Sequence, residues 1–333
     1  MTAFQQIFLG FRKKGEVSRF RYIQFFSMAS LANTSSNRIG KFPVIAVFVI
    51  TGLSVSPNIS YAEGLDGLGI LLDTGYSYDN NLTHASDPTD KLSDSSLNLN
   101  LIGTKAVALS EHTRLVLSGF IDTEAFARYS GLDRLSANAE AEYMYRPSGE
   151  FEAPTFGFIT GAGRDEFKSG LRKNDHYSAG VTLRQPVTDR VNLYAALKNN
   201  ISRSDNDVFN TRDTSTQLNM DYGFSNGNTL YLTTEYRVGD IVSTTQAALA
   251  YREIAAASIN DDVFSSGQPM RDYRIKGKTA VMTLGCNLPL GGKKSLDISW
   301  RYARSASDTS PDNDFSVIKY VGSQFSVNYL MGF

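Results

Sequence analysis

The sequence predicts an all-β fold, a transmembrane antiparallel up-and-down β-barrel of about twelve strands. Three observations support this prediction. Apolar residues occupy every second position in a series of segments from residue 68 to the end of the chain. The connections between these segments are alternately short and long. Aromatic residues collect near both ends of the apolar faces, as expected for strands that cross two bilayer interfaces.

The start of the chain has the features of a targeting segment. Residues 42–53 form an apolar run that is too short to span a bilayer as a helix, which takes about 20 residues. Arg38 and Lys41 precede this run, and Ser60 and Ala62 provide the small residues of a cleavage site. We therefore expect a secretory signal peptide that is cleaved after Ala62.

This interpretation divides the chain into two parts. We expect residues 1–62 to be an N-terminal extension and signal peptide, and residues 63–333 to be the barrel. Met28 would give a signal peptide of ordinary length, which leaves the true start open. Basic residues outnumber acidic ones in the first part, so the predicted barrel carries a net negative charge. A nucleic-acid partner needs clustered positive charge, and none is predicted.

Six predicted strands lie in the first half of the barrel. Each places apolar side chains on one face and polar or small side chains on the other. Their apolar faces are Ile70, Leu72, Tyr76 and Tyr78; Leu97, Leu99 and Leu101; Leu115, Leu117 and Ile121; Leu135, Ala137, Ala139, Ala141, Tyr143 and Tyr145; Phe156, Phe158 and Ala162; and Tyr177, Ala179, Val181 and Leu183.

Six further strands continue the pattern to the last residue. Their apolar faces are Val191, Leu193, Ala195 and Leu197; Leu218, Met220, Tyr222 and Phe224; Leu230, Leu232 and Tyr236; Met282, Leu284 and Leu288; Leu296, Ile298, Trp300 and Tyr302; and Phe325, Val327, Tyr329, Met331 and Phe333.

The connections predict an even strand number. Mostly short turns alternate with longer polar loops, so that all turns fall on one side of the barrel and all loops on the other. Residues 239–270 are the one ambiguous connection, because they contain further apolar runs. They form either one long loop with its own hairpin or two more membrane strands, which makes fourteen strands the alternative.

The composition agrees with a barrel and excludes a helical membrane protein. The mean hydropathy is −0.23 and 41% of the residues are hydrophobic. The chain has one cysteine, Cys286, so no intrachain disulfide can form. We predict no cofactor and no metal site. The acidic stretches at residues 205–207 and 308–314 contain carboxylates that suit Ca²⁺, but we interpret them as solvated loops.

The faces opposite the apolar ones should line the lumen. They mix charges of both signs with Asn, Ser, Thr and Gln. Such a lining forms either a salt-bridged interior or a hydrophilic conduit, and twelve strands do not decide between them. The predicted lumen-lining charges are Glu140, Glu142, Arg146, Arg184, Lys198, Asp221, Glu235, Arg237, Asp297 and Arg301.

The histidines offer one candidate for catalysis. His84 and His112 fall in connections and are expected to be solvated. His176 and Ser178 resemble the His-x-Ser pair of barrel lipases and lipid A deacylases, in which period 2 places both side chains on one face. Those enzymes present the pair to lipid, whereas here Tyr177 takes the lipid face. We therefore predict no enzyme, and keep a lipid-modifying barrel as the alternative function.

Two segments resemble known outer-membrane proteins. Residues 75–85, Gly-Tyr-Ser-Tyr-Asp-Asn-Asn-Leu-Thr-His-Ala, are similar to the first-strand signature of the outer-membrane β-barrel porins found in exopolysaccharide operons. His84 stands where an Arg is usual. Residues 302–313 and the terminal strand resemble the ending of the same group, and Phe333, Met331 and Tyr329 look like the assembly signal of outer-membrane barrels.

The resemblance implies a function and partners. It implies a non-enzymatic, porin-like transport or secretion barrel in the bacterial outer membrane, with a role in exopolysaccharide export. The expected partners are outer-membrane lipid and lipopolysaccharide, the barrel-assembly machinery and polysaccharide-export components. A structural or adhesive outer-membrane barrel is a further alternative.

Overall fold

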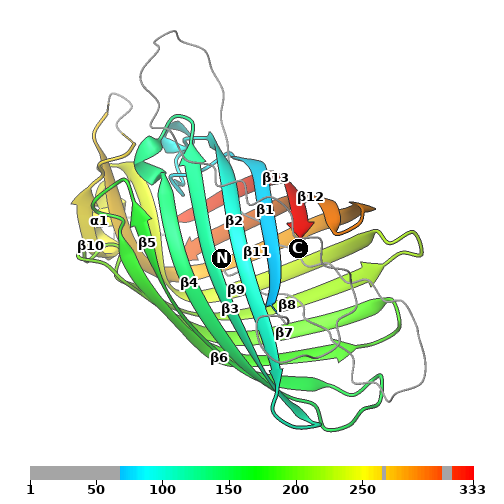
Figure 1. Ribbon diagram of the computed structural model, residues 1–333. Helices are drawn as coiled ribbons and strands as arrows, with labels where there is room; N and C mark the ends of the chain where they lie inside the picture. Colours follow the sequence, from blue (N-terminus) through cyan, green and yellow to red (C-terminus); the bar gives the residue numbers. More distant parts are fainter. Residues whose placement is uncertain (1–67, 265–267, 310–316) are drawn as a thin grey trace.

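The computed structural model describes residues 68–264, 268–309 and 317–333. These residues form one antiparallel sheet of 13 strands that curls into a barrel (Figure 1). All strands except β10 belong to the closed ring, because β9 pairs directly with β11. The twelve-stranded barrel predicted from the sequence is thereby confirmed. The predicted signal peptide and its cleavage site lie outside the described residues.

The strands of the ring follow one another in chain order, each antiparallel to the next. Their alternating sequences determine their number and their direction. Their bounds are β1 Leu68–Asp79, β2 Asp94–Ala108, β3 Thr113–Phe126, β4 Arg134–Tyr145, β5 Thr155–Phe167, β6 Asn174–Pro186, β7 Val191–Arg203, β8 Thr211–Gly223, β9 Thr229–Gln246, β11 Met270–Gly291, β12 Lys294–Ser307 and β13 Lys319–Gly332.

The first and last strands close the ring. The register of β1 on β13 runs from Leu71 opposite Gly332 to Asp79 opposite Gln324. Beyond it, the backbone N–H of Phe333 donates to the carbonyl of Ile70 at 2.9 Å. Closure gives each strand of the ring two partners, so no row of backbone groups is left to face lipid unpaired.

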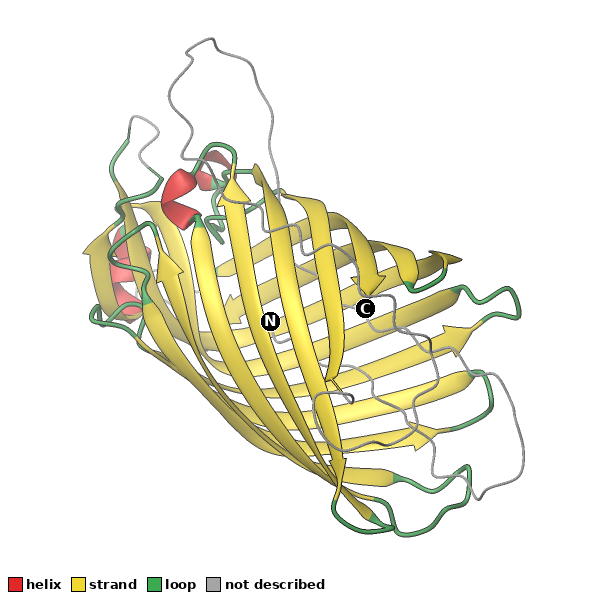
Figure 2. Cartoon of the chain, in the orientation of Figure 1, coloured by secondary structure: helices red, strands yellow, loops and turns green. Residues whose placement is uncertain are grey.

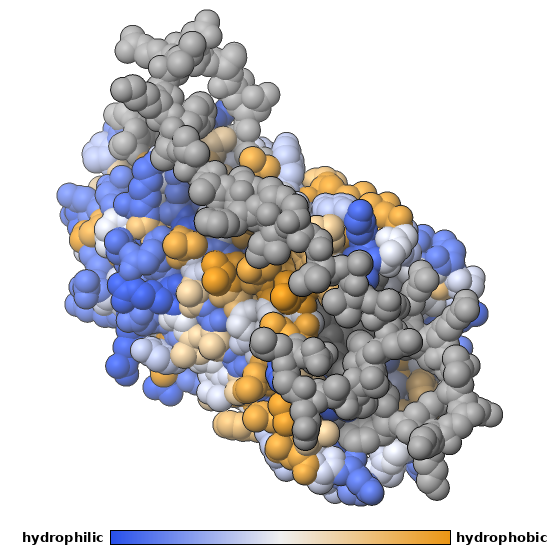
Figure 3. Space-filling model, in the orientation of Figure 1, coloured by the Kyte–Doolittle hydropathy of each residue, from blue (hydrophilic) through white to orange (hydrophobic). Residues whose placement is uncertain are grey.

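Each strand has an apolar outer face and a polar inner face. Outward side chains such as Leu97 and Val181 are 62% and 54% exposed. Figure 3 shows hydrophobic surface running across the barrel between more hydrophilic regions. Inward side chains are mostly buried and polar, as the period-2 pattern predicts. Outward aromatics lie at both strand ends, namely Tyr76, Tyr78, Tyr177 and Tyr236 at the loop end and Tyr143, Tyr145, Phe156, Phe158 and Phe224 at the turn end.

The two ends of the barrel differ in structure. One end carries tight turns, such as the β11–β12 turn, in which Gly291 and Gly292 adopt positive φ angles of 95° and 60°. The other end carries the long loops and all the described helices (Figure 2). Two are single 3₁₀ turns, Pro88–Asp90 and Ser130–Leu132, and one is the short helix α1, Leu249–Ile254.

The ambiguous segment adds no strand to the ring and carries a hairpin of its own, which agrees with the first of the two forms expected from the sequence. β9 and β11 continue past their neighbours to lengths of 18 and 22 residues and stay paired up to Gln246 and Met270. Between them lie α1 and β10, Ala255–Asn260, which pairs with the upper part of β11. The fourteen-strand alternative is therefore wrong. No helix in the described ranges is long and apolar enough to cross a membrane.

Candidate functional site in the barrel lumen

The predicted lumen-lining charges lie on the inner wall, because they alternate along each strand with apolar residues that are exposed on the outer wall. Eight of these side chains are buried, and Arg237 and Arg301 are half-buried. Arg146 lies just past the end of β4, and its guanidinium donates to the carbonyl of Phe151 at 3.0 Å. The buried members are Glu140, Glu142, Arg146, Arg184, Lys198, Asp221, Glu235 and Asp297.

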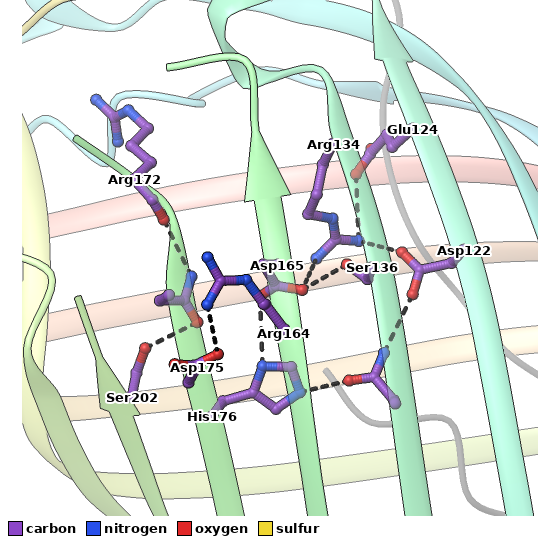
Figure 4. Close-up of polar contacts among 12 residues, drawn as sticks. Asp122, Glu124, Arg134, Ser136, Arg164, Asp165, Arg172, Asp175, His176 and Ser202 are labelled. Atoms are coloured by element: carbon purple, nitrogen blue, oxygen red, sulfur yellow. Dashed lines mark hydrogen bonds and ion pairs between the residues drawn. The ribbon is translucent and has the colours of Figure 1, made fainter. Parts of the chain in front are cut away.

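Arg134 is the centre of a carboxylate cluster in the loop-end half of the lumen (Figure 4). Its guanidinium lies 2.9 Å from Asp122 and 3.7 Å from Glu124, both on β3. On the other side it lies 3.8 Å from Asp165 of β5. Ser136 donates to Asp165, and Ser96 donates to Glu124 at 2.6 Å. Three carboxylates thus share one arginine, which leaves the cluster with a net negative charge.

His176 borders this cluster and does not engage Ser178. Its Nε2 lies 2.5 Å from the Asn138 Oδ1, and its Nδ1 lies 3.5 Å from Asp165 (Figure 4). His176 and Ser178 do share the lumenal face, as period 2 requires. The imidazole nevertheless contacts an amide and a carboxylate of the wall, so the geometry gives no support to a His–Ser catalytic pair.

Glu142 and Arg184 form a buried, bidentate ion pair in the lumen. The guanidinium Nη1 and Nη2 donate to the two carboxylate oxygens at 2.6 and 2.8 Å. The side chains belong to β4 and β6, and they meet because Gly157 of the intervening strand β5 has no side chain. A Cβ at this position would lie 2.7 Å from the Glu142 Oε1. Arg184 also stacks over the ring of Tyr194 at 5.0 Å.

A second bridge of this kind crosses β11 on the other wall. The Tyr231 hydroxyl of β9 lies 3.0 and 3.1 Å from the two carboxylate oxygens of Asp297 on β12. It passes over Gly285, where an added Cβ would collide with the Tyr231 ring. Glycines on the middle strand therefore let polar side chains two strands apart reach each other across the inner wall.

The inner wall carries more acidic than basic side chains. Ion pairs such as Lys198 with Glu140 at 3.8 Å and Arg237 with Glu235 at 2.8 Å neutralise only part of them. The inward acids of the described strands are Asp73, Asp79, Asp94, Asp122, Glu124, Glu140, Glu142, Asp165, Asp213, Asp221, Glu235 and Asp297. The inward bases, with Arg146 after β4, are Arg114, Arg134, Arg146, Arg184, Lys198, Arg237 and Arg301.

Several of these residues were not in the predicted set. Asp73, Asp122 and Glu124 fall on faces that the sequence identifies as polar, but they were not selected. Arg134 continues the alternation of β4 before Leu135, and Asp165 continues the inward series of glycines on β5. The period-2 pattern of β4 and β5, extended by one or two residues toward the loop end, identifies both Arg134 and Asp165 as lumenal.

Arg172 connects the loops at the mouth of the barrel. It forms ion pairs with Asp261 and, at 3.1 Å, with Asp272. Its guanidinium also lies 4.8 Å from the Phe209 ring and 5.5 Å from the Phe264 ring. The β5–β6, β7–β8 and β10–β11 connections therefore meet at one side chain. Phe264 adds an apolar cluster to this assembly, packed with Leu132, Met270, Leu82, Leu92, Phe126, Tyr129 and Val263.

The first loop, residues 80–93, is tied to the extension of β9. The Thr244 N–H donates to the carbonyl of Thr83 at 2.7 Å, and Ser243 donates to the carbonyl of His84 at 2.7 Å. His84 has a left-handed φ of 51°, and its ring stacks on Tyr320 at 5.2 Å. The residue is exposed at the mouth of the barrel, and desolvation by the surrounding loops lowers the pKa of its imidazole. His84 is exposed, as expected from the sequence, and its left-handed backbone and its stacking on Tyr320 add a constraint that the sequence did not indicate.

The other sequence candidates occupy simpler surroundings. Cys286 is half-buried and forms no disulfide. Part of the acidic stretch at residues 308–314 lies outside the described residues, and in the described ranges no group of three metal-ligating side chains is arranged around one point. Phe333 is 43% exposed at the turn end of the barrel.

Comparison with known proteins supports the fold. No protein-family model matches the chain, and no curated protein matches it. The COG4313 outer membrane channel from Pseudomonas putida F1 is similar in structure, with a TM-score of 0.50, 12% identity and coverage of 84% of this chain and 100% of that one.

Two porins give weaker matches. The KdgM porin, solved with disordered oligogalacturonate, has a TM-score of 0.41 and 11% identity over 79% of this chain and 99% of its own. The NanC porin has a TM-score of 0.41 and 8% identity over 78% and 98%. At these identities the likeness concerns the fold alone, which is that of outer-membrane barrels. The exopolysaccharide-operon group stays a prediction.

Proposed function

We propose that this protein is a porin-like barrel of the bacterial outer membrane that passes small hydrophilic solutes and prefers cations and neutral molecules to anions. The observation that supports this most directly is the excess of acidic side chains on the inner wall of a barrel whose outer wall is apolar. Fixed charges that line a narrow passage act on every ion that enters it.

The passage is expected to be narrow. Eight strands enclose a space that side chains fill and sixteen leave an aqueous channel, so twelve are intermediate. The Glu142–Arg184 and Tyr231–Asp297 bridges bring further side chains over the wall. The loops joined at Arg172 reduce access at the mouth. These features favour small solutes and modest conductance.

Polysaccharide export is the finer form of this function that the family resemblance implies. The acidic wall suits a neutral or cationic chain better than a polyanion, because like charges repel inside a low-dielectric passage. An exported polymer, if this barrel handles one, should accordingly lack a dense series of carboxylates or phosphates. Polysaccharide-synthesis genes beside the gene for this protein would support the export role.

Ion selectivity in planar bilayers tests the proposal. The parent barrel should give a cation-selective reversal potential in a KCl gradient. The double change Asp221→Asn with Glu235→Gln should shift this potential toward anions. Glu111→Gln with Glu152→Gln removes the same charge from exposed turns and should leave the potential unchanged. Absence of single-channel current in parent and variants would overturn the channel proposal.

A further inference from the structure

A group of basic side chains lies on the outer face of the barrel at the loop end of three adjacent strands. Lys278 of β11 is opposite Ala306 of β12, which is opposite Lys319 of β13. Arg304 precedes Ala306 by two residues and lies on the same face. It is therefore a diagonal neighbour of both lysines, at the usual Cα–Cα distance of about 7–8 Å for such neighbours. Lys276 lies one step further toward the loops. We name these four residues the β11–β13 basic patch.

The side chains of this patch are accessible. Lys276 and Lys278 are 59% and 53% exposed, although they pair with Asp240 at 2.7 Å and Asp308 at 2.9 Å. Arg304 and Lys319 are also exposed, and neither has an acidic partner among the described residues. The patch therefore keeps a net positive charge on a protein whose barrel is net negative.

The patch lies at the height of lipid headgroups. Arg304 follows Tyr302 and Trp300 on the outer face of β12, and Trp300 is 39% exposed. Aromatic rings of this kind mark the boundary between hydrocarbon and headgroups. A cation one step beyond such a boundary meets the phosphate level of the leaflet, where each Lys or Arg adds attraction to anionic lipid.

The strands that follow the patch around the ring, β1 to β4, lack this feature. At the loop ends of β1 to β4 the outward positions are uncharged, namely Tyr76, Tyr78, Ser95, Leu97, Thr123, Ala125 and Leu135. Other strands also carry exposed outward arginines near their loop ends, namely Arg164, Arg203 and Arg212 on β5, β7 and β8. The β11–β13 basic patch differs from them in that four cations lie on three consecutive strands, within reach of one multiply charged group.

We propose that the β11–β13 basic patch binds the phosphate groups of a phosphorylated glycolipid of the outer leaflet, namely lipopolysaccharide through its lipid A. Arg304 and Lys319 contact the phosphates directly, Lys278 is shared between phosphate and Asp308, and the acyl chains lie along the apolar face below Tyr302. The planar guanidinium suits bidentate phosphate contacts, and the lysines add point charges. This inference rests on the outer-membrane location in the proposed function and not on conduction.

Lipid retention by the refolded chain tests this inference. The barrel in neutral detergent with a chelator is mixed with diphosphorylated lipid A, and bound lipid is measured by native mass spectrometry. Trp300 is the single tryptophan of the chain and reports binding beside the patch through its fluorescence. The change Lys278→Gln, Arg304→Gln and Lys319→Gln should weaken binding about tenfold or more.

The controls separate a phosphate site from general adhesion. Arg190→Gln, Lys293→Gln and Lys294→Gln remove the same charge from exposed positions at the turn end and should leave affinity unchanged. Equal retention by the patch variant and the parent, or equal retention of dephosphorylated lipid A by the parent, would overturn the proposal. Arg304→Gln alone gives a second test if the triple variant does not fold. A barrel that binds lipid A but carries no current would contradict the proposed conduction only.

Discussion

Glu142 and Arg184 are joined by two hydrogen bonds across a strand to which neither belongs. The intervening residue, Gly157, provides the space. This arrangement shows how a period-2 sequence forms a cross-braced lumen: charged residues on alternate strands meet where the strand between them has glycine. The Tyr231–Asp297 bridge over Gly285 repeats the arrangement on the opposite wall.

Adding a methyl group at Gly157 should weaken the barrel. In Gly157→Ala the new Cβ would collide with the Thr182 Oγ1 and lie 2.7 Å from the Glu142 Oε1, so both Thr182 and the ion pair must shift. We expect a loss of about 1–3 kcal/mol of folding free energy, typical of overpacking. The measurement is the denaturant midpoint of heat-modifiable migration. Gly119→Ala is the control, because nothing lies within 4 Å of its new Cβ, and a similar loss there would contradict this explanation.

Breaking the Glu142–Arg184 pair should lower the stability of the folded barrel. Glu142→Gln leaves a buried guanidinium without its carboxylate, and loss of one partner of a buried pair costs about 3–5 kcal/mol. The double variant with Arg184→Gln should recover part of this loss, which a double-mutant cycle measures. The exposed Arg164–Glu166 pair serves for comparison, since its removal should change stability by less than about 1 kcal/mol. Equal effects of the two pairs would disprove a special role for burial.

Arg172→Gln should loosen the mouth loops. The change removes the ion pairs to Asp261 and Asp272 and the ring contacts that join three connections. We expect faster protease cleavage at residues 204–210 and 255–264 in intact cells, and higher conductance if the loops limit access. Lys173→Gln removes an exposed charge next in sequence and should leave cleavage unchanged. Unchanged cleavage in the Arg172 variant would mean that the apolar cluster around Phe264 is sufficient to keep the loops packed.

Acid should loosen the first loop through His84. Its enclosure, with a smaller effect from Arg301 and Arg172 and an opposing one from Asp79, lowers the pKa of the imidazole in the folded barrel. The unfolded loop then binds a proton more readily, so loop packing is complete above about pH 6.5 and weakens as the pH falls below it. The hydrogen-exchange rates of residues 80–93, corrected for intrinsic rates, should increase as the pH falls from 7.5 to 5.

A non-titrating residue at this position should remove that dependence. Asn tolerates the left-handed φ of 51° and carries no titrating group, so His84→Asn should keep the loop folded at both pH values. His112→Asn at an exposed turn is the matched control and should preserve the parent's pH response. A response that survives in His84→Asn would point to another titrating group.

Deletion of Phe333 should reduce assembly. The residue adds the last backbone hydrogen bond between the terminal strand and β1, and its ring carries the predicted assembly signal with Met331 and Tyr329. We expect several-fold less heat-modifiable protein in the outer membrane. Phe333→Tyr retains an aromatic terminus and the backbone bond and should assemble normally. Normal levels of the deletion variant would show that the strand closes without its last residue.

The sequence by itself determined the fold class, a ring of about twelve strands, the side of each strand that faces outward and the positions of most lumenal charges. It could do so because period 2 and the turn spacing are local properties, and a closed barrel leaves few alternatives. Glu142 and Arg184 were both recognised as lumenal from alternation alone. The sequence also identified residues 239–270 as the connection that departs from the simple alternation of turns and loops.

Only the tertiary structure decided which lumenal charges meet. Arg184 pairs with Glu142 two strands away, and three carboxylates gather around Arg134, because strand register and tilt bring distant residues to one height. The same holds for the mouth, where Arg172 joins loops that no local pattern connects. The local sequence pattern also did not show the extension of β9 and β11. In it β9 pairs with β11, and β11 pairs with β10, which depends on contacts between segments rather than on alternation.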